Sequence, residues 1–280
     1  MWQKIFTGPM AGKKIQRLIV THHHPDHVGL AGWFQKEYKV SLWMTRTAWL
    51  TARMLRLDEQ EVPPPETIEF WTQAGMCSDI MEERKSGKPF NFADAVSALP
   101  LGFRRIVDNE EIEIGNRIWK VRVGNGHAPE HATLWSNVDD IVIAGDQIIS
   151  SISPNLGVYA TEPNANPVKE WIDTCHKLSA FASDKHLTLS GHKLPFTGLK
   201  FRLKQMVENH ELALNRLVNF LEKPHTAEEC FSILFGKSIQ KSEYGLALVE
   251  AVAHVNYLYL EGTVSRVLDK NGAFRYQALS

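Results

Sequence analysis

Short apolar runs alternate with segments of helical spacing along the N-terminal part of the chain. Residues 16–20 and 40–44 are rich in β-branched and large apolar side chains, which is typical of buried strands. Residues 31–37 and 45–56 have the composition of helices. This alternation predicts a mixed α/β region.

Hairpin signals appear further along the same region. Residues 112–123 form two alternating runs separated by Gly115-Asn116, a dipeptide typical of a tight turn. Hairpins mixed with helices favour an α/β sandwich over one doubly wound parallel sheet. We also expect a helix over 66–84, after a run of prolines, and strands over 132–135, 141–144 and 187–190.

The last part of the chain predicts three helices followed by a hairpin, which is the order of elements in a winged-helix domain. Thr226 and Glu229 have the spacing of a capping box, and Asn271-Gly272 is typical of a type I′ turn. The predicted helices cover 203–221, 226–235 and 243–260, and the predicted strands cover 263–268 and 273–277. We therefore predict two domains, 1–202 and 203–280.

Composition narrows the class of protein. The 280 residues are 44% hydrophobic and 22% charged, as in an ordinary globular protein. No apolar run reaches the roughly 18 residues needed to span a bilayer, and the first residues lack the apolar core of a signal peptide. We therefore expect a cytoplasmic protein with no membrane contact.

Charge argues against a nucleic-acid-binding module. The chain has 31 basic and 32 acidic residues, and residues 200–280 carry ten basic against nine acidic residues. The helix that would read DNA carries Glu243, Glu250 and Glu261 and many apolar residues. Packing or dimerisation is therefore favoured over binding to duplex DNA.

Three scattered cysteines, Cys77, Cys175 and Cys230, form no CxxC pair and argue against a disulfide framework. Cys175 precedes His176, a pairing that could suggest a thiol catalyst. We favour the simpler interpretation, a small buried apolar residue.

The stretch Thr21-His22-His23-His24-Pro25-Asp26-His27 carries the strongest chemical signal. His22 and His24 are two residues apart, so an extended backbone directs both to the same side. Asp26 and His27 follow Pro25, where we expect the chain to leave the strand and begin a helix. Imidazole and carboxylate groups are the usual ligands of zinc and similar ions. This turn therefore predicts part of a metal site.

Three further ligand-type residues follow predicted strands. His127 comes after Gly124-Asn125-Gly126, Asp146 after Gly145, and His192 after Gly191. Glycine permits a tight turn where a side chain must reach a metal ion. Each pair alone is a weak signal.

Taken in order, these residues resemble the metallo-beta-lactamase superfamily of metal-dependent hydrolases, whose HxHxDH motif matches His22, His24, Asp26 and His27. The resemblance implies a four-layer αβ/βα sandwich, with leading strands of the first sheet missing, and a C-terminal winged-helix domain. It implies that His22, His24 and His127 hold one ion, that Asp26, His27 and His192 hold a second, and that Asp146 bridges both. Glu130 and His131, just after His127, are weaker candidates for supporting hydrogen bonds.

The implied chemistry is hydrolysis by a metal-bound hydroxide, with two divalent ions, zinc or alternatively iron or manganese. Asp26 is the candidate catalytic residue and would orient the nucleophile. The substrate would be an ester, thioester or lactone of a small molecule. Two alternatives stay open: a metal-dependent endoribonuclease or phosphodiesterase acting on single-stranded RNA, and a nonenzymatic nucleic-acid-binding regulator. The full ligand set and the neutral tail disfavour the regulator.

Only 21 residues precede His22, fewer than in most members of this family. We expect a truncated chain, a misassigned start or a natural short variant. A sheet that lacks strands exposes an edge and an apolar face. We therefore predict reduced stability or a homodimer, which light scattering and thermal unfolding would measure. A monodisperse monomer with a high melting temperature would contradict this prediction.

Overall fold

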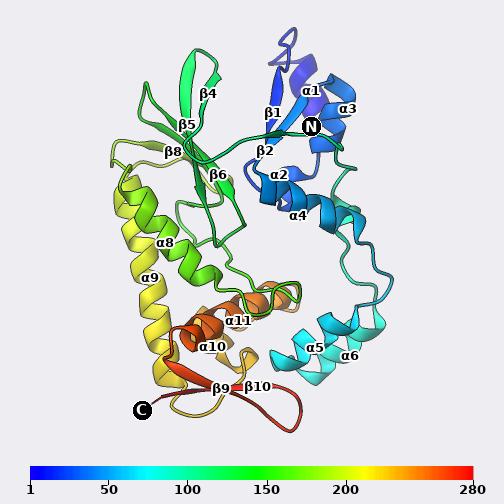
Figure 1. Ribbon diagram of the computed structural model, residues 1–280, viewed down its shortest axis with the longest axis vertical. Helices are drawn as coiled ribbons and strands as arrows, with labels where there is room; N and C mark the ends of the chain where they lie inside the picture. Colours follow the sequence, from blue (N-terminus) through cyan, green and yellow to red (C-terminus); the bar gives the residue numbers. More distant parts are fainter. Residues whose placement is uncertain (280) are drawn as a thin grey trace. The chain divides into compact units, whose positions relative to one another are not determined.

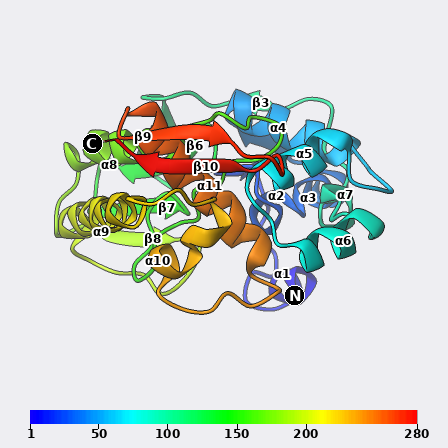
Figure 2. The same cartoon turned by 90° about the horizontal axis from the view of Figure 1, so that it is seen from below.

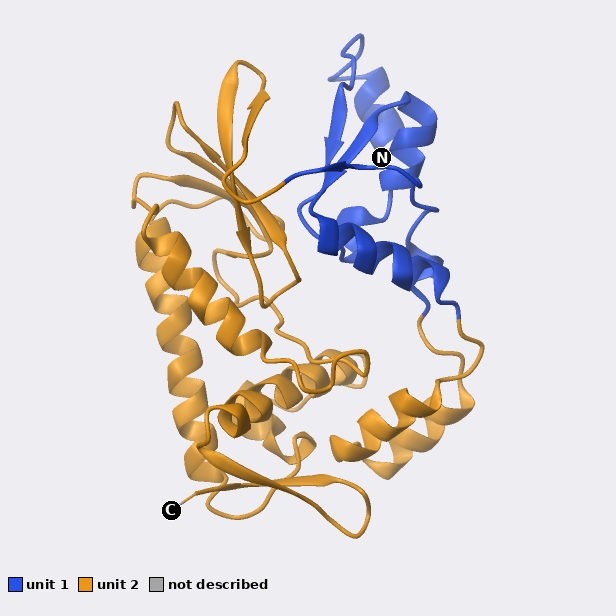
Figure 3. Ribbon diagram, viewed as in Figure 1, with its two compact units in different colours: residues 1–59, 91–106 blue, residues 60–90, 107–280 orange. Residues whose placement is uncertain are grey.

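Two units, each with its own sheet and its own buried apolar cluster, make up the computed structural model, which describes residues 1–279 (Figure 1). Unit 1 contains residues 1–59 and 91–106, and unit 2 contains residues 60–90 and the chain from 107 onward (Figure 3). Within the described residues, no helix is both long enough and apolar enough to cross a membrane.

Unit 1 is a small parallel sheet covered by helices. Its strand order is β1-β2-β3, and β1 pairs with β2 in parallel from Arg17 opposite Ser41. Leu42, Met44 and Ala48 lie in its buried cluster. The elements are α1 (Trp2–Thr7), β1 (Arg17–Ile19), α2 (Pro25–Val28), α3 (Ala31–Tyr38), β2 (Ser41–Met44), α4 (Arg46–Leu57), α7 (Phe92–Ala95) and β3 (Arg104–Arg105).

Unit 2 contains a five-stranded sheet of order β4-β5-β6-β7-β8, in which β7 and β8 are parallel and the other pairs antiparallel. Gly115 and Asn116 have φ angles of 57° and 62°, so the predicted hairpin has the two-residue turn that joins Ile114 to Arg117. The strands are β4 (Glu111–Ile114), β5 (Arg117–Gly124), β6 (His131–Ser136), β7 (Ile141–Gly145) and β8 (Leu187–Ser190).

The helices of unit 2 share one apolar cluster with one face of this sheet. Helix α8 contributes Trp171 and Leu178, both fully buried. The C-terminal hairpin is antiparallel (Figure 2). The remaining elements are α5 (Pro65–Gln73), α6 (Ser78–Ser86), α8 (Pro167–Ser179), α9 (Leu199–Phe220), the 3₁₀ turn η1 (Glu228–Cys230), α10 (Phe231–Phe235), α11 (Tyr244–Leu260), β9 (Val264–Leu268) and β10 (Phe274–Ala278).

The single helix predicted over 66–84 is wrong, because two helices occupy this range. Gly75 separates α5 from α6 with a φ angle of +80°, which an α-helix does not contain. A Cβ atom at Gly75 would lie 2.5 Å from the Thr226 side chain, so close packing also requires glycine. Phe70 and Met76 of this segment are buried in the core of unit 2.

The capping box at Thr226 is confirmed, whereas the type I′ turn at Asn271-Gly272 is wrong. Thr226 N–H donates to Glu229 Oε2 at 2.8 Å, and Glu229 N–H donates back to Thr226 Oγ1 at 3.3 Å. In the hairpin, Leu268 pairs with Phe274, which leaves a five-residue connection. The Asp269 carboxylate accepts from the backbone N–H groups of residues 271 and 273 and so fixes this longer turn.

The buried interpretation of Cys175 is confirmed. Its side chain has no exposed surface, and burial raises the pKa of its thiol. A raised pKa keeps sulfur protonated at neutral pH, and the thiol is a poor nucleophile.

Two buried histidines predict a specific acid sensitivity of unit 2. His210 Nδ1 lies 3.3 Å from His254 Nε2, and burial lowers the pKa of His210 to about 3. The folded state keeps this imidazole neutral, whereas the unfolded chain takes up a proton below pH about 6.5. The contribution of the neutral His210 to the free energy of unfolding is therefore fully present above that pH. It is lost as the pH falls towards 3, by about 1.4 kcal/mol per pH unit.

Urea unfolding at pH 7, 6 and 5 checks this expectation. We expect the free energy of unfolding of the H210Q variant to fall less steeply with decreasing pH than that of the unaltered chain. The exposed His176 of α8 offers a control, because H176Q should leave the slope unchanged. Equal slopes for H210Q and the unaltered chain would contradict the prediction.

Candidate metal centre

Four ligand-type side chains of unit 1 come from one strand-to-helix turn. β1 ends at Ile19, and Pro25 is the first residue of α2, as the sequence predicts. Proline suits this position because its fixed φ angle matches the helix and its missing N–H is not needed there. His22 and His24 precede the helix, and Asp26 and His27 lie in its first turn.

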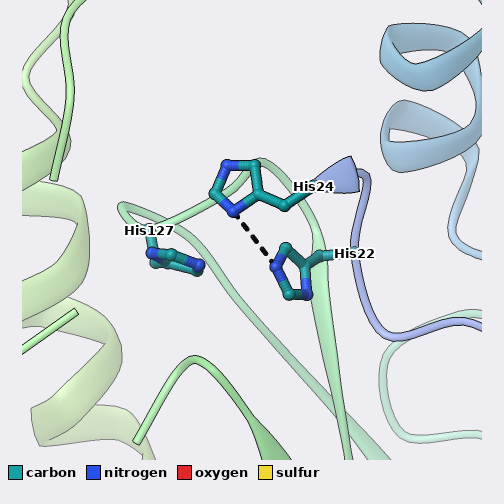
Figure 4. Close-up of side chains that lie close together, drawn as sticks. All are labelled: His22, His24 and His127. Carbon is teal, nitrogen blue, oxygen red and sulfur yellow. Dashed lines mark hydrogen bonds between the residues drawn. The ribbon is translucent and has the colours of Figure 1, made fainter. Parts of the chain in front are cut away.

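The donor atoms of this turn lie close together. His22 Nε2 is 3.1 Å from His24 Nδ1 (Figure 4, dashed line). Two nitrogen ligands of a tetrahedral zinc ion, each about 2.0–2.1 Å from the metal, are roughly 3.3 Å apart. His22 is fully buried, and its Nδ1 lies 3.0 Å from Thr21 Oγ1. The spacing of this pair therefore fits two ligands of one ion.

Asp26 and His27 are also neighbours. Asp26 Oδ2 lies 3.4 Å from His27 Nε2, and the side chains are 53% and 16% exposed. The carboxylate of Asp26 is therefore accessible from solvent, as a group that acts on a substrate must be.

The second set of side chains belongs to unit 2 and meets at Asp146. Asp146 Oδ2 lies 3.2 Å from His192 Nε2 and 3.7 Å from His127 Nε2. The Asp146 and His127 side chains are each 6% exposed, whereas that of His192 is 48% exposed. One carboxylate oxygen therefore lies close to two imidazole nitrogens, and all three atoms are of the kind that binds metal ions.

The sheet of unit 2 explains why these three residues converge. β7 and β8 are parallel, so Asp146 and His192 leave the same edge of the sheet. Gly191 N–H donates to Gly145 O at 2.8 Å and extends the pairing to the residues beside them. His127 (drawn in Figure 4) lies between β5 and β6.

Glycine at two of the three predicted positions has a positive φ angle, a conformation that glycine adopts without steric cost. Gly126 and Gly145 have φ angles of +98° and +52°, which place the following ligands after sharp turns. Gly191 has no positive φ angle, so the expected reason for glycine does not apply there.

Glu130 and His131, the weaker candidates for supporting hydrogen bonds, differ in their burial and in their contacts. His131 is fully buried, and its Nε2 accepts the backbone N–H of Asp146 at 3.1 Å. His131 therefore supports the backbone of Asp146. Glu130 has a φ angle of +48°, and its backbone N–H donates to Asn125 Oδ1 at 2.8 Å.

Asn155 and Arg202 also contact this region, although no sequence motif contains them. Asn155 O accepts a hydrogen bond from His127 Nδ1 at 2.9 Å. The buried Arg202 of α9 donates to the carbonyls of Ile149 and Ile152, in the segment after Asp146. These contacts leave no signal in the sequence, because the acceptor in each is a backbone carbonyl, a group that every residue has.

The donors of both units fit divalent metal ions. All seven predicted ligands offer imidazole nitrogen or carboxylate oxygen, the donors that suit zinc, iron and manganese. Four of these residues belong to unit 1 and three belong to unit 2.

Comparisons with known proteins agree with this chemistry. A sequence model described as "Metallo-beta-lactamase superfamily" matches residues 10–198, and one described as "Metallo-beta-lactamase-like, C-terminal domain" matches residues 214–279. A probable metallo-hydrolase of Bacillus subtilis (strain 168) is 22% identical over 271 residues, which cover 93% of this chain and 80% of the relative.

Two crystal structures are similar along nearly the whole chain. A beta-lactamase domain protein from Burkholderia ambifaria has a TM-score of 0.89 and 30% identity, over 99% of this chain and 79% of the other. A metallo-beta-lactamase family protein from Thermus thermophilus has a TM-score of 0.77 and 24% identity, over 95% and 80%. The predicted fold class is therefore confirmed, whereas the winged-helix description and the shortened N-terminus stay predictions.

The turn before His127 leads to a prediction about stability. A Cβ atom at Gly126 would lie 2.3 Å from Trp171 Cβ and 2.6 Å from Pro167 O. We expect G126A to lose about 3 kcal/mol or more, because backbone strain and overpacking both act there. Gly198 also has a positive φ angle, +85°, but has no such neighbours within 4 Å.

The matched G198A variant should therefore lose only about 1 kcal/mol, the cost of the backbone conformation alone. Urea unfolding of both variants measures the difference. Equal losses would show that close packing at Gly126 does not constrain the turn.

Proposed function

Since the chain belongs to the metallo-beta-lactamase superfamily, we propose that this metal-dependent hydrolase uses two divalent ions. His22, His24 and His127 would hold one ion, and Asp26, His27 and His192 would hold the other. Asp146 would be shared by both. The observation that carries the proposal is the Asp146 carboxylate, whose Oδ2 lies within 3.7 Å of the Nε2 atoms of both His127 and His192.

Charge supports a pair of ions over a single ion. Two divalent cations bring four positive charges, and Asp26 and Asp146 return two negative ones. The balance attracts a hydroxide and a substrate with anionic character. When bound, such ions lower the pKa of coordinated water from about 15.7 towards 7 and polarise the electrophile. Zinc is the ion that we propose, with iron and manganese as alternatives.

Asp26 and Asp146 would have different tasks. Asp146 is buried and hydrogen-bonded through its backbone to His131, so it is fixed in place. Asp26 is half exposed on the first turn of a short helix. We propose that Asp146 organises the site and that Asp26 accepts a hydrogen bond from the attacking nucleophile and orients it.

We propose an ester, thioester or lactone of a small molecule as the substrate, with a phosphodiester of single-stranded RNA as the alternative. The burial of α11 disfavours recognition of duplex DNA. Leu248, Ala251 and Val255 on this helix are at most 1% exposed, so it lacks a bare face to enter a groove. A homodimer and a cytoplasmic location stay predictions from the sequence.

Metal content and hydrolysis test the proposal together. Elemental mass spectrometry of tag-free, unchelated protein should find about two ions per chain. The chain should then hydrolyse p-nitrophenyl esters, with bis-p-nitrophenyl phosphate and a labelled single-stranded RNA as the competing substrates. Activity on the RNA alone would reject the acyl substrate. Metal near zero that added ions do not restore would reject the dinuclear site.

The D26N variant tests the catalytic role of Asp26. We expect a loss of about 10²–10⁴-fold in kcat, because the nucleophile loses its orienting carboxylate. The exposed Asp173 of α8 offers a control, since D173N makes the same chemical change far from the ligands in sequence. Equal activities of D26N and D173N would contradict the assigned role.

A further inference from the structure

The metal ligand His127 is held by a segment that has no regular structure of its own. Its Nδ1 lies 2.9 Å from the backbone oxygen of Asn155, and a carbonyl can only accept a hydrogen bond. Nδ1 therefore carries the proton, and the lone pair of the neutral ring lies on Nε2. This is the nitrogen that lies near Asp146 Oδ2. The carbonyl of Asn155 thus selects the tautomer that can bind a metal ion.

No sheet hydrogen bonds fix that carbonyl, because residues 151–159 form neither helix nor strand. The segment is attached to helix α11 instead. The Asn155 side-chain amide donates to Glu250 Oε2 at 2.6 Å and to Leu246 O at 3.3 Å. Val158 N–H donates to Val249 O at 3.0 Å. Three contacts with one helix therefore set the position of Asn155.

Helix α11 is a rigid support for this purpose. Leu248, Ala251 and Val255 are buried in the core of unit 2, and His254 packs against His210. Glu250 has the one carboxylate among residues 244–260 of this largely apolar helix, and this carboxylate accepts the short hydrogen bond from Asn155. A carboxylate in such a place is costly unless a donor satisfies it.

We propose that Glu250 and Asn155 are positioning residues that connect helix α11 of the C-terminal region to the metal ligand His127. The inference rests on the proposed function, since it takes His127 as a ligand. It assigns the C-terminal region a role in metal binding that does not require nucleic acid. Each contact in the chain, from Glu250 through Asn155 to His127, lies within unit 2.

The affinity for zinc tests this assignment without a substrate. Competition with a chromogenic chelator would measure the affinity of full-length protein and of variants. We expect E250A to bind the zinc ion that His127 holds about 10–100-fold less tightly, as loss of a group that orients a ligand usually does. E250Q keeps an oxygen that accepts the Asn155 amide, so its affinity should stay within about threefold of the unaltered chain.

Two further variants separate positioning from general destabilisation. N155A removes the side chain but keeps the backbone carbonyl, and should weaken zinc binding as E250A does. It also keeps α11 intact should E250A fail to fold. The double variant should bind no more weakly than either single variant, because both changes break one connection. E261A removes an exposed carboxylate at the end of the same helix and should bind as tightly as the unaltered chain.

The outcomes distinguish this inference from the proposed function. Unaltered protein that binds neither zinc, iron nor manganese would overturn both. Two zinc ions in the unaltered protein, with unchanged affinity in E250A or N155A, would overturn the positioning role alone. Equal weakening in E261A, no recovery in E250Q, or additive losses in the double variant would also overturn it.

Discussion

A carboxylate that is nearly removed from water needs nearby hydrogen-bond donors or positive charge. The Asp146 side chain is 6% exposed, and two imidazoles lie within 3.7 Å of one of its oxygens. The sheet of unit 2 provides much of the surroundings of this group. The parallel β7–β8 pair places Asp146 beside His192, and His131 holds its backbone N–H. The sheet therefore positions two of the predicted ligands.

Local signals in the sequence predicted local geometry well. The turn from His22 to His27 spans six positions, so one strand end and one proline determine most of its conformation. The hairpin at Gly115-Asn116 is equally local. Predictions of local structure failed where a side chain from outside the local motif changes the conformation of the backbone. At Asn271-Gly272 the carboxylate of Asp269 fixes a longer turn, and at Gly75 the packing against Thr226 separates two helices.

Structure that depends on contacts between residues far apart in the chain left weaker signals in the sequence, or none. Helix α8 was not predicted, although Trp171, Cys175 and Leu178 have the spacing of a buried helix face. The role of Asn155 could not be predicted from the sequence, because the contact with His127 uses a backbone carbonyl. Any residue at that position has the same group. Only the fold shows that this carbonyl meets an imidazole nitrogen.

In the C-terminal region, the order of elements and the burial of the helices favour different roles. Three helices and a hairpin suggest a DNA-binding module, and charge alone is a modest argument against it. Burial is the stronger argument, since most of α11 faces the interior of unit 2. A helix that enters a DNA groove must present a polar, positively charged face. The carboxylate of Glu250 on α11 binds the side chain of Asn155. Glu250 is thus directed towards the segment whose backbone holds His127.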